Sequence, residues 1–355
     1  MTASLQFDPI TEFDTAVRLA RSGRTLAGLK HARAAYKMVI ESGDEAMRRK
    51  ALNTVAICQG AHGQFIEAVA DAMDAFALAH KAGDELEATH ALATLAGAAS
   101  FILDTLDTSM RMLDQCLDRA LRLGNVPLEV RVRNVRGILL GTLRRFSEAE
   151  HEFAVALALV DQAGENTRPA MLAGNIAALS VKQSRSADKA DRPHYWSIAL
   201  ARIQEAIDIA VQEGNADVES RGYYNLGDVR VQQGDLAAAL AAFDRSMELA
   251  RGVGQRARVI DAHVERGKLF ALSQDWNMAR AEFQSAFDEA DAHRPTIQTA
   301  TAAEHLGVAC ERLGDAKSAL GWVARAGVER ELFERESVQA RRQLETFWRD
   351  FGAGQ

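Results

Sequence analysis

The chain has 355 residues, of which 48% are apolar and 26% are charged, and its formal net charge is -7 at pH 7. This composition is too apolar for a disordered protein, and the acidic balance disfavours a general attraction to the phosphate backbone of nucleic acid. Aromatic residues make up 6% and there are five prolines. Together with abundant alanine, this favours helices over a β-sandwich or barrel.

The cellular setting follows from features that the sequence lacks. The N-terminal segment lacks the basic region and the apolar region that a secretory signal contains. No apolar stretch approaches the roughly 18 residues that a membrane span needs. The three cysteines, Cys58, Cys116 and Cys310, are far apart and form no CxxC pair. We therefore predict a cytoplasmic protein with free thiols and without a zinc site.

Small residues recur along the chain and divide it into eight units. They lie at Ala16, Ala56, Gly97, Gly137, Ala177, Gly227, Gly267 and Gly307, at spacings of 40 or 41 residues except for one of 50. In most units another small residue follows twelve positions later, a larger apolar residue sixteen later and a small one nineteen later. Offsets of three and four residues share one helical face, and small residues let two helices approach closely. Each unit is therefore predicted to be a helical hairpin.

Glycines recur at two places in the repeat, at the end of a unit and at the turn between its two helices. One set is expected to end the second helix of each unit as a C-terminal cap: Gly43, Gly83, Gly124, Gly164, Gly214 and Gly254. A second set falls between the two helices of a unit, at Gly63, Gly234 and Gly314. We expect left-handed backbone at these turns, because glycine adopts it without steric cost.

The fifth unit fits the repeat when ten residues are inserted, which also explains the single spacing of 50. The inserted residues, at about 183–192, include the polar run QSRSADKAD. We predict a solvent loop there, between the two helices of the unit. A flap or partner contact is the alternative.

The repeats end near Ala326, and residues 328–351 read as one long helix with an apolar side. A solenoid needs an atypical terminal element to cover its last apolar face. We therefore divide the chain into a solenoid over 1–326 and a C-terminal capping helix and tail over 327–355.

The small and aromatic residues of the later units carry a family resemblance. Leu226, Gly227, Ala239 and Phe243 form one such set, and Gly267, Phe270, Ala279, Phe283 and Ala286 form another. These units resemble tetratricopeptide repeats (TPR), in the elongated form of bacterial regulatory and signalling proteins. The resemblance implies an all-α fold: a right-handed α-solenoid of about eight TPR-like helical hairpins with a C-terminal capping helix. It also implies a concave groove, lined by the first helices, that binds a protein or peptide.

Fixed offsets from the small residues place polar side chains on the outward side of the first helices. The predicted peptide- or partner-binding residues are Arg131, Asn134, Asn175, Arg221, Tyr224, Asn225, Asp228 and Lys268; Asn53 and Asp261 share their offsets. An asparagine amide can donate to a peptide carbonyl and accept from its N–H, and arginine can hold a carboxylate at two points. The alternative is that each Asn bonds the adjacent unit in a packing role, and that Tyr224 shares packing with Tyr223.

Catalytic chemistry is not indicated. There is no GxSxG, HExxH, P-loop or EF-hand run, and RGVGQR at 251–256 reads as a helix end. Cys310 is expected to be a buried thiol, and acidic pairs such as Glu148 and Glu150 are expected to face solvent. We predict a non-enzymatic protein- or peptide-binding module without a cofactor or metal, and expect no nucleic acid and no membrane; an oligomer is possible, but the sequence does not demand one. A ligand-sensing part of a signalling protein, such as a cyclase, kinase or transcription regulator, is the alternative; an enzyme with an unrecognised site is a weaker one.

Overall fold

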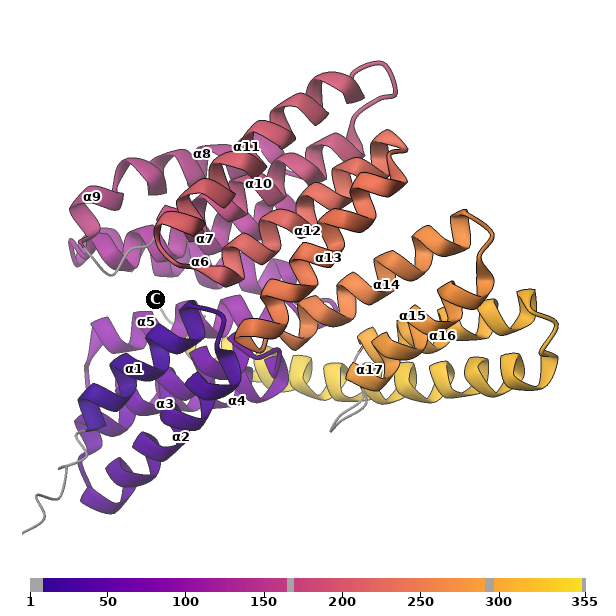
Figure 1. The fold of residues 1–355 in the computed structure, drawn as a ribbon. Coiled ribbons are helices and arrows are strands. Elements are labelled where there is room, and N and C mark those ends of the chain that lie inside the picture. Colours follow the sequence, from indigo (N-terminus) through magenta and orange to yellow (C-terminus); the bar gives the residue numbers. More distant parts are fainter. Residues whose placement is uncertain (1–8, 165–168, 291–296, 353–355) are drawn as a thin grey trace, which may run out of the picture. The chain divides into compact units, whose positions relative to one another are not determined.

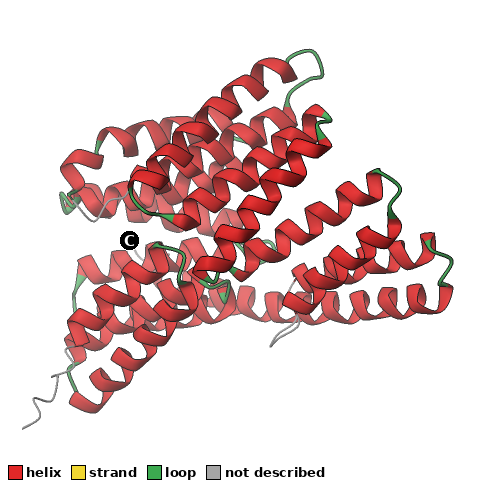
Figure 2. Cartoon of the chain, in the orientation of Figure 1, coloured by secondary structure: helices red, strands yellow, loops and turns green. Residues whose placement is uncertain are grey.

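The structure is a computed structural model that describes residues 9–164, 169–290 and 297–352. Over these ranges the chain forms seventeen helices and no strand (Figures 1 and 2). The predicted all-α fold of helical hairpins is confirmed. Within the described ranges, no helix is long and apolar enough to cross a membrane.

The chain divides into two compact units, which we describe separately. Unit 1 comprises Met1–Arg168 and Val338–Gln355, and unit 2 comprises Pro169–Ser337. The helices of unit 1 are α1 (Pro9–Arg21), α2 (Thr25–Ser42), α3 (Glu45–Ala61), α4 (Phe65–Lys81), α5 (Glu85–Ala99), α6 (Leu106–Arg122), α7 (Val126–Thr142), α8 (Phe146–Ala158) and α9 (Val160–Ala163).

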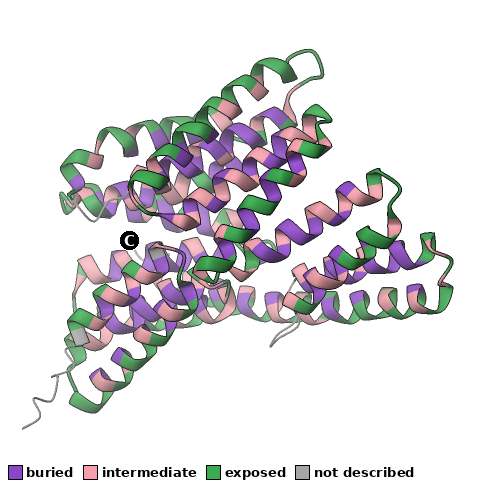
Figure 3. Ribbon diagram, viewed as in Figure 1, coloured by how far each residue is buried: buried purple, intermediate pink, exposed green. Residues whose placement is uncertain are grey.

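Unit 2 continues the succession of helix pairs. Its helices are α10 (Pro169–Ser186), α11 (Arg192–Gln212), α12 (Ala216–Gln233), α13 (Leu236–Val253), α14 (Arg256–Leu272), α15 (Trp276–Ala290) and α16 (Ile297–Arg312). The last helix, α17 (Ala316–Gly352), pairs with α16 and then continues into unit 1. In both units, buried residues line the sides of the helices that face their neighbours (Figure 3).

The predicted helix crossings depend on glycines that face aromatic rings. A Cβ placed on Gly227 would lie 2.6 Å from the ring of Phe243, and one on Gly137 would lie 2.7 Å from that of Phe153. Real side chains do not approach so closely, so only glycine fits at these positions. Gly97 differs, because a Cβ there would meet only Val135 at an ordinary 3.7 Å.

At the junctions between successive pairs, a glycine ends one helix and the residue after it often caps the next. The predicted glycines all have positive φ, from 60° at Gly124 to 78° at Gly164. The next residue often caps the following helix: Asp44 accepts a hydrogen bond from the Met47 N–H at 2.9 Å, and Asn125 accepts one from Leu128 at 3.0 Å. An N-cap of this kind stabilises a helix by about 1 kcal/mol.

Outside the fifth pair, the turns inside the pairs share one left-handed position, seven residues after the small residue. Gly63, Gly234 and Gly314 occupy it with φ between 80° and 85°, as predicted. Three non-glycine residues adopt the same conformation in other pairs: Asp104, Arg144 and Gln274, with φ between 58° and 61°. The backbone geometry is therefore set by the repeat even where the sequence does not favour it.

The insertion in the fifth pair forms less loop than predicted. Helix α10 runs through Ser186 and α11 begins at Arg192, so only five residues connect them. Ser184 is fully buried and its hydroxyl bonds the Val181 carbonyl oxygen and the Gln232 side chain. The extra residues thus extend helices, because their side chains find partners on α12. The ten-residue shift itself is confirmed by the burial of Ala199, Ile203 and Ala206.

The C-terminal helix begins earlier than predicted. The sequence indicated a break near residue 327, but α17 is continuous from Ala316 because Gly327 has helical backbone with open space around it. Ala326 and Trp322 pack in unit 2 against α15 and α16. In unit 1, the ring of Phe347 contacts that of Phe76 on α4 at 5.3 Å between centroids. The separate capping role of residues 327–355 stays a prediction.

Candidate functional site

The first helices of unit 2 carry most of the predicted binding residues. Helices α10, α12, α14 and α16 contact one another in succession, so they form one continuous layer. Asn175 lies on α10, and Lys268 lies on α14. Helix α12 contributes Arg221, Tyr224, Asn225 and Asp228. We call these six residues the polar face of unit 2.

Asn175 and Arg221 connect two neighbouring first helices. The Arg221 guanidinium donates from Nη1 to the Asn175 Oδ1 at 2.8 Å. Burial lowers the pKa of Arg221, and the positive charge of Arg258 lowers it further, while Asp217 opposes both effects. The predicted alternative, an Asn that bonds the adjacent unit, is therefore realised at Asn175.

Tyr224 packs on one side and carries a cation on the other. Its ring contacts Phe243 at 5.4 Å between centroids, and the Arg258 guanidinium carbon lies 5.1 Å from the Tyr224 ring centre. Burial raises the pKa of the Tyr224 hydroxyl. Tyr223 packs instead against the core between α10 and α11, so both tyrosines take part in packing.

Asn225 is the most unusual residue of the polar face. Its side chain is buried, with 7% of the residue exposed. Among the residues that the structure describes, its Nδ2 has no hydrogen-bond partner. A buried donor without an acceptor costs about 1–3 kcal/mol, so such groups call for an explanation.

Asp228 is engaged within the protein. The Arg185 Nη2 lies 2.5 Å from its Oδ2, and the Arg185 Nε donates to its Oδ1 at 3.1 Å. Burial raises the pKa of Asp228, which Arg185 and the Gln232 side chain oppose. Arg185 belongs to the extended end of α10, so the insertion contributes directly to this face.

Helix α14 carries further charged residues next to the polar face, some of which sequence reasoning missed. The Lys268 Nζ lies 2.7 Å from the Glu265 Oε1, and the Gln298 Nε2 donates to the Asp261 Oδ1 at 2.8 Å. Arg258 lies one helical turn before Asp261, outside the offsets used for prediction. Extending those offsets by one turn toward the N-terminus of the helix would have included it.

The two remaining predicted residues, Arg131 and Asn134, lie on α7 in unit 1. The Arg131 Nη2 donates to the Thr94 hydroxyl at 2.7 Å, and that hydroxyl donates to the Asn53 Oδ1 at 2.7 Å. These bonds connect the first helices α3, α5 and α7. Asn53 therefore has the packing role, and Asn134 is half-buried on the same helix as Arg131.

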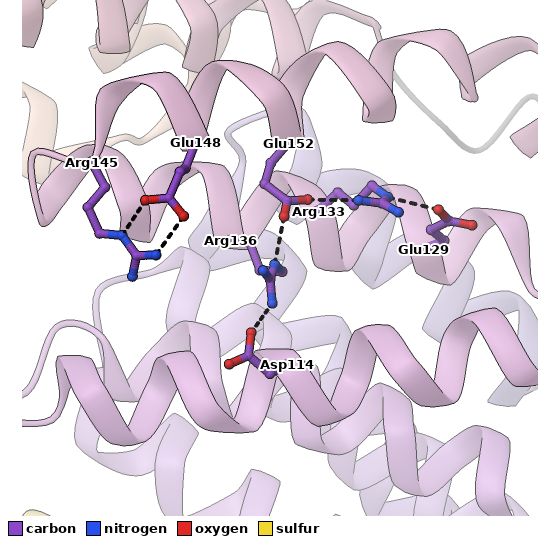
Figure 4. Close-up of polar contacts among 7 residues, drawn as sticks. All are labelled: Asp114, Glu129, Arg133, Arg136, Arg145, Glu148 and Glu152. Atoms are coloured by element: carbon purple, nitrogen blue, oxygen red, sulfur yellow. Dashed lines mark hydrogen bonds and ion pairs between the residues drawn. The ribbon is translucent and has the colours of Figure 1, made fainter.

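An ion-pair network in unit 1 connects helices α6, α7 and α8. Glu152 on α8 lies 3.0 Å from both Arg133 and Arg136 on α7, measured between oxygen and nitrogen (Figure 4). Arg133 also bonds Glu129, and Arg136 reaches Asp114 on α6.

The same network recurs in unit 2, which identifies it as part of the scaffold. Arg266, Glu282 and Asp244 lie 130 residues after Arg136, Glu152 and Asp114. The Arg266 Nη2 lies 2.8 Å from the Glu282 oxygen, and its Nη1 contacts Asp244. Because the same ion pairs occur at equivalent positions of two repeats, we interpret them as contacts that stabilise helix packing, and we assign them no ligand.

The thiols are unsuited to nucleophilic chemistry. Cys58, Cys116 and Cys310 are free and buried. Burial raises the pKa of the first two to about 12 and also raises that of Cys310. In the described part of the chain, no three His, Cys, Asp or Glu side chains gather as a metal site. The residues of RGVGQR end α13, with Gly254 as its left-handed cap.

Comparison with known proteins places the fold. No family model matches the chain, and no curated protein matches it significantly. A Rap protein complexed with competence and sporulation factor is similar in structure, with a TM-score of 0.55, 14% identity, and coverage of 92% of this chain and 99% of that chain. NprR in complex with its cognate peptide NprX has a TM-score of 0.53 and 10% identity, over 99% and 87%.

A third similar structure is a signal transduction ATPase with numerous domains from Pyrococcus horikoshii, which has a tetratricopeptide repeat sensor. Its TM-score is 0.56 at 13% identity, over 88% of this chain and 47% of that chain. The protein therefore has a helical-repeat fold of the tetratricopeptide class. Within that class, it shares its arrangement of helices with the Rap and NprR structures.

Proposed function

We propose that the protein is a non-enzymatic regulatory module that acts in the cytoplasm and binds an extended peptide on the polar face of unit 2. The observation that carries the proposal is the buried Asn225 Nδ2, which has no hydrogen-bond partner in the described part of the chain; Asn225 lies beside Arg221 and Tyr224 on one turn of α12. The structures of NprR with its peptide and of Rap with its factor support it, since they share this fold.

The chemistry of the face suits a peptide backbone. The Asn225 amide can donate to a peptide carbonyl and accept from a peptide N–H, so its missing hydrogen bond would be made in the complex. Asn175 is the other proposed backbone contact on this face; Asn134, on α7 of unit 1, is proposed separately as a backbone contact. The Asn175 Oδ1 already accepts a hydrogen bond from Arg221. A peptide N–H would therefore either replace Arg221 at this oxygen or share the oxygen with it.

The charged and aromatic residues are proposed to select among sequences. On the polar face, Arg221, Tyr224, Asp228 and Lys268 would contact side chains of the bound segment. Arg131, on α7 of unit 1, is proposed separately as a residue that contacts a peptide side chain. Asp228 forms an ion pair with Arg185, and Lys268 forms one with Glu265. The charge of each residue is therefore already partly neutralised before a peptide binds. Selection by these two residues would act through the pairs rather than through single charges.

The alternative is a ligand-sensing part of a signalling protein, and α17 favours it. This single helix contributes its first 22 residues, 316–337, to unit 2 and the following residues to unit 1. A ligand that shifts the register or packing of α16 and α17 in unit 2 would therefore act on an element that unit 1 also contains. Its output would be a partner protein or another domain.

Peptide capture tests the proposal. Immobilised protein is incubated with a random hexapeptide library, and retained peptides are identified by mass spectrometry. Asn225→Ala and Arg221→Met should lose the retained set, whereas Arg202→Met should keep it, because Arg202 pairs with Glu205 on the exposed side of α11. Equal retention by the folded Asn225→Ala and Arg221→Met variants would contradict binding at this face.

A further inference from the structure

Two arginines, Arg221 of the polar face and Arg258 next to it, lack a carboxylate partner among the described residues. Arg221 on α12 and Arg258 on α14 form no ion pair with any side chain in the described ranges, and the Nε of each is buried without a hydrogen bond. Arg266, further along α14, also has a buried Nε without a hydrogen bond, but it pairs with Glu282 and Asp244. Each of these side chains, Arg221 and Arg258, is partly buried, so its guanidinium has lost part of its hydration and has no carboxylate at contact distance to replace it.

The structure holds both guanidinium groups in place. Arg221 is fixed by its bond to the Asn175 Oδ1 at 2.8 Å. Arg258 lies over the ring of Tyr224, 5.1 Å from its centre, which favours a cation electrostatically. Arg221, Tyr224 and Asn225 follow one another at i, i+3 and i+4, so they share one side of α12.

Acidic residues nearby do not neutralise the pair at contact distance. Burial lowers the pKa of Arg221, and Asp217 opposes that shift. Burial raises the pKa of Asp261, and Arg258 opposes that shift. Both carboxylates are therefore within electrostatic range of an arginine. The Asp261 carboxylate instead accepts its hydrogen bond from Gln298 on α16. The two cations thus remain available for an anion that comes from outside the protein.

We propose that Arg221 and Arg258 together bind a carboxylate of the peptide ligand, and that the buried Asn225 amide donates to the carbonyl of the adjacent peptide bond. The inference rests on the proposed function and makes it specific: the preferred ligands are acidic at one position. Planar guanidinium groups match a carboxylate with paired hydrogen bonds, each stronger than a neutral one. The carboxylate belongs either to an Asp or Glu side chain or to the C-terminus of the peptide.

Three matched hexapeptide libraries distinguish these sources by capture on immobilised protein and mass spectrometry. The first has a free C-terminus and no acidic residue, the second is amidated with Asp scanned through each position, and the third is amidated with Asn in place of Asp. We expect one of the first two to be enriched about tenfold or more over the third, since a charged hydrogen bond contributes about 1.5–3 kcal/mol. The enriched library identifies the source of the carboxylate.

The variants decide whether these arginines are responsible. Arg258→Met should abolish the enrichment, Arg221→Met should do the same, and Arg202→Met on α11 should leave it unchanged. Arg221→Met removes the bond to Asn175 and Arg258→Met removes the contact with the Tyr224 ring, so the melting temperature of both variants is measured and affinity is compared per folded molecule. If peptides are retained without a preference for a carboxylate, or if the preference survives Arg258→Met, the carboxylate inference is wrong while the proposed function stands. Retention of none of the libraries would instead overturn the proposed function.

Discussion

The close crossing at Gly267 allows a sharp test of how the repeat encodes packing. A Cβ at this position would collide with the ring of Phe283, whereas a Cβ at Gly321, on the exposed side of α17, would meet nothing within 4 Å. Both glycines lie inside helices of unit 2. Gly267→Ala and Gly321→Ala are therefore the same chemical change in two different environments.

The magnitudes follow from two opposing effects. Alanine gains about 1 kcal/mol over glycine in a helix interior, and both variants receive that gain. Overpacking against a fixed ring costs about 1–3 kcal/mol, and only Gly267→Ala incurs it. We therefore expect Gly321→Ala to be about 1–3 kcal/mol more stable than Gly267→Ala, with the wild type between them or level with the latter.

Urea unfolding followed by circular dichroism at 222 nm measures this difference. Gly267→Leu and Ala279→Phe, at a fully buried position of the same crossing, should destabilise the protein further. Phe283→Leu should recover part of the loss when it is added to Gly267→Ala, because neighbouring sites couple. If Gly267→Ala stabilises the protein as much as Gly321→Ala does, the assigned crossing is wrong.

Other predictions concern α17, the turns and a buried carboxyl. Phe347→Ala should cost unit 1 about 3–5 kcal/mol, because a buried ring against Phe76 is lost; unchanged urea unfolding would refute this contact. Arg144→Gly should raise the melting temperature, because relief of about 1–2 kcal/mol of left-handed strain exceeds the added unfolded-state entropy of about 0.4–1 kcal/mol. Burial raises the pKa of Asp261, so the folded state binds its proton more tightly than the unfolded state does, and this carboxyl destabilises the fold as pH rises through and above its unfolded pKa. Asp261→Asn should therefore increase the unfolding free energy at about pH 7 more than at about pH 4; an equal change at both would contradict the assignment.

The repeat itself could be predicted because identical offsets must satisfy identical geometry. The pairing of Gly227 with Phe243 and of Gly267 with Phe283 follows from a fixed spacing of sixteen residues. The left-handed turn at Arg144 could also have been found, since it shares the register of Gly63 and Gly234. Residue preference alone hides it, because arginine does not favour that backbone.

The partner of a buried face could not be predicted in the same way. The apolar side of α17 was visible in the sequence, but periodicity does not say whether Phe347 meets the last repeat or Phe76 on α4. The helical extension of α10 was missed for a related reason. Its polar residues suggested a loop, while Ser184 and Arg185 find hydrogen-bond partners on α12 that only the folded chain supplies.

The sequence predicted where the polar residues lie on the first helices, but not which of them already have hydrogen-bond partners within the protein. The offsets placed Asn53, Asn175 and Asn225 alike, yet Asn53 bonds Thr94 and Asn175 bonds Arg221. Whether an amide is already used depends on which side chain the neighbouring helix presents. Only the structure separates Asn225, whose buried Nδ2 lacks a partner among the described residues, from the other two.

Affinity and stability measured on the same asparagine variants test the central claim most directly. The assay titrates a peptide retained by the wild type into Asn225→Ala and Asn53→Ala and records the unfolding free energy of each. We expect Asn225→Ala to weaken binding by about 1–2 kcal/mol with little change in stability, and Asn53→Ala to lower stability by about 1 kcal/mol with affinity per folded molecule unchanged. Normal affinity in a folded Asn225→Ala protein would contradict peptide binding at the polar face of unit 2.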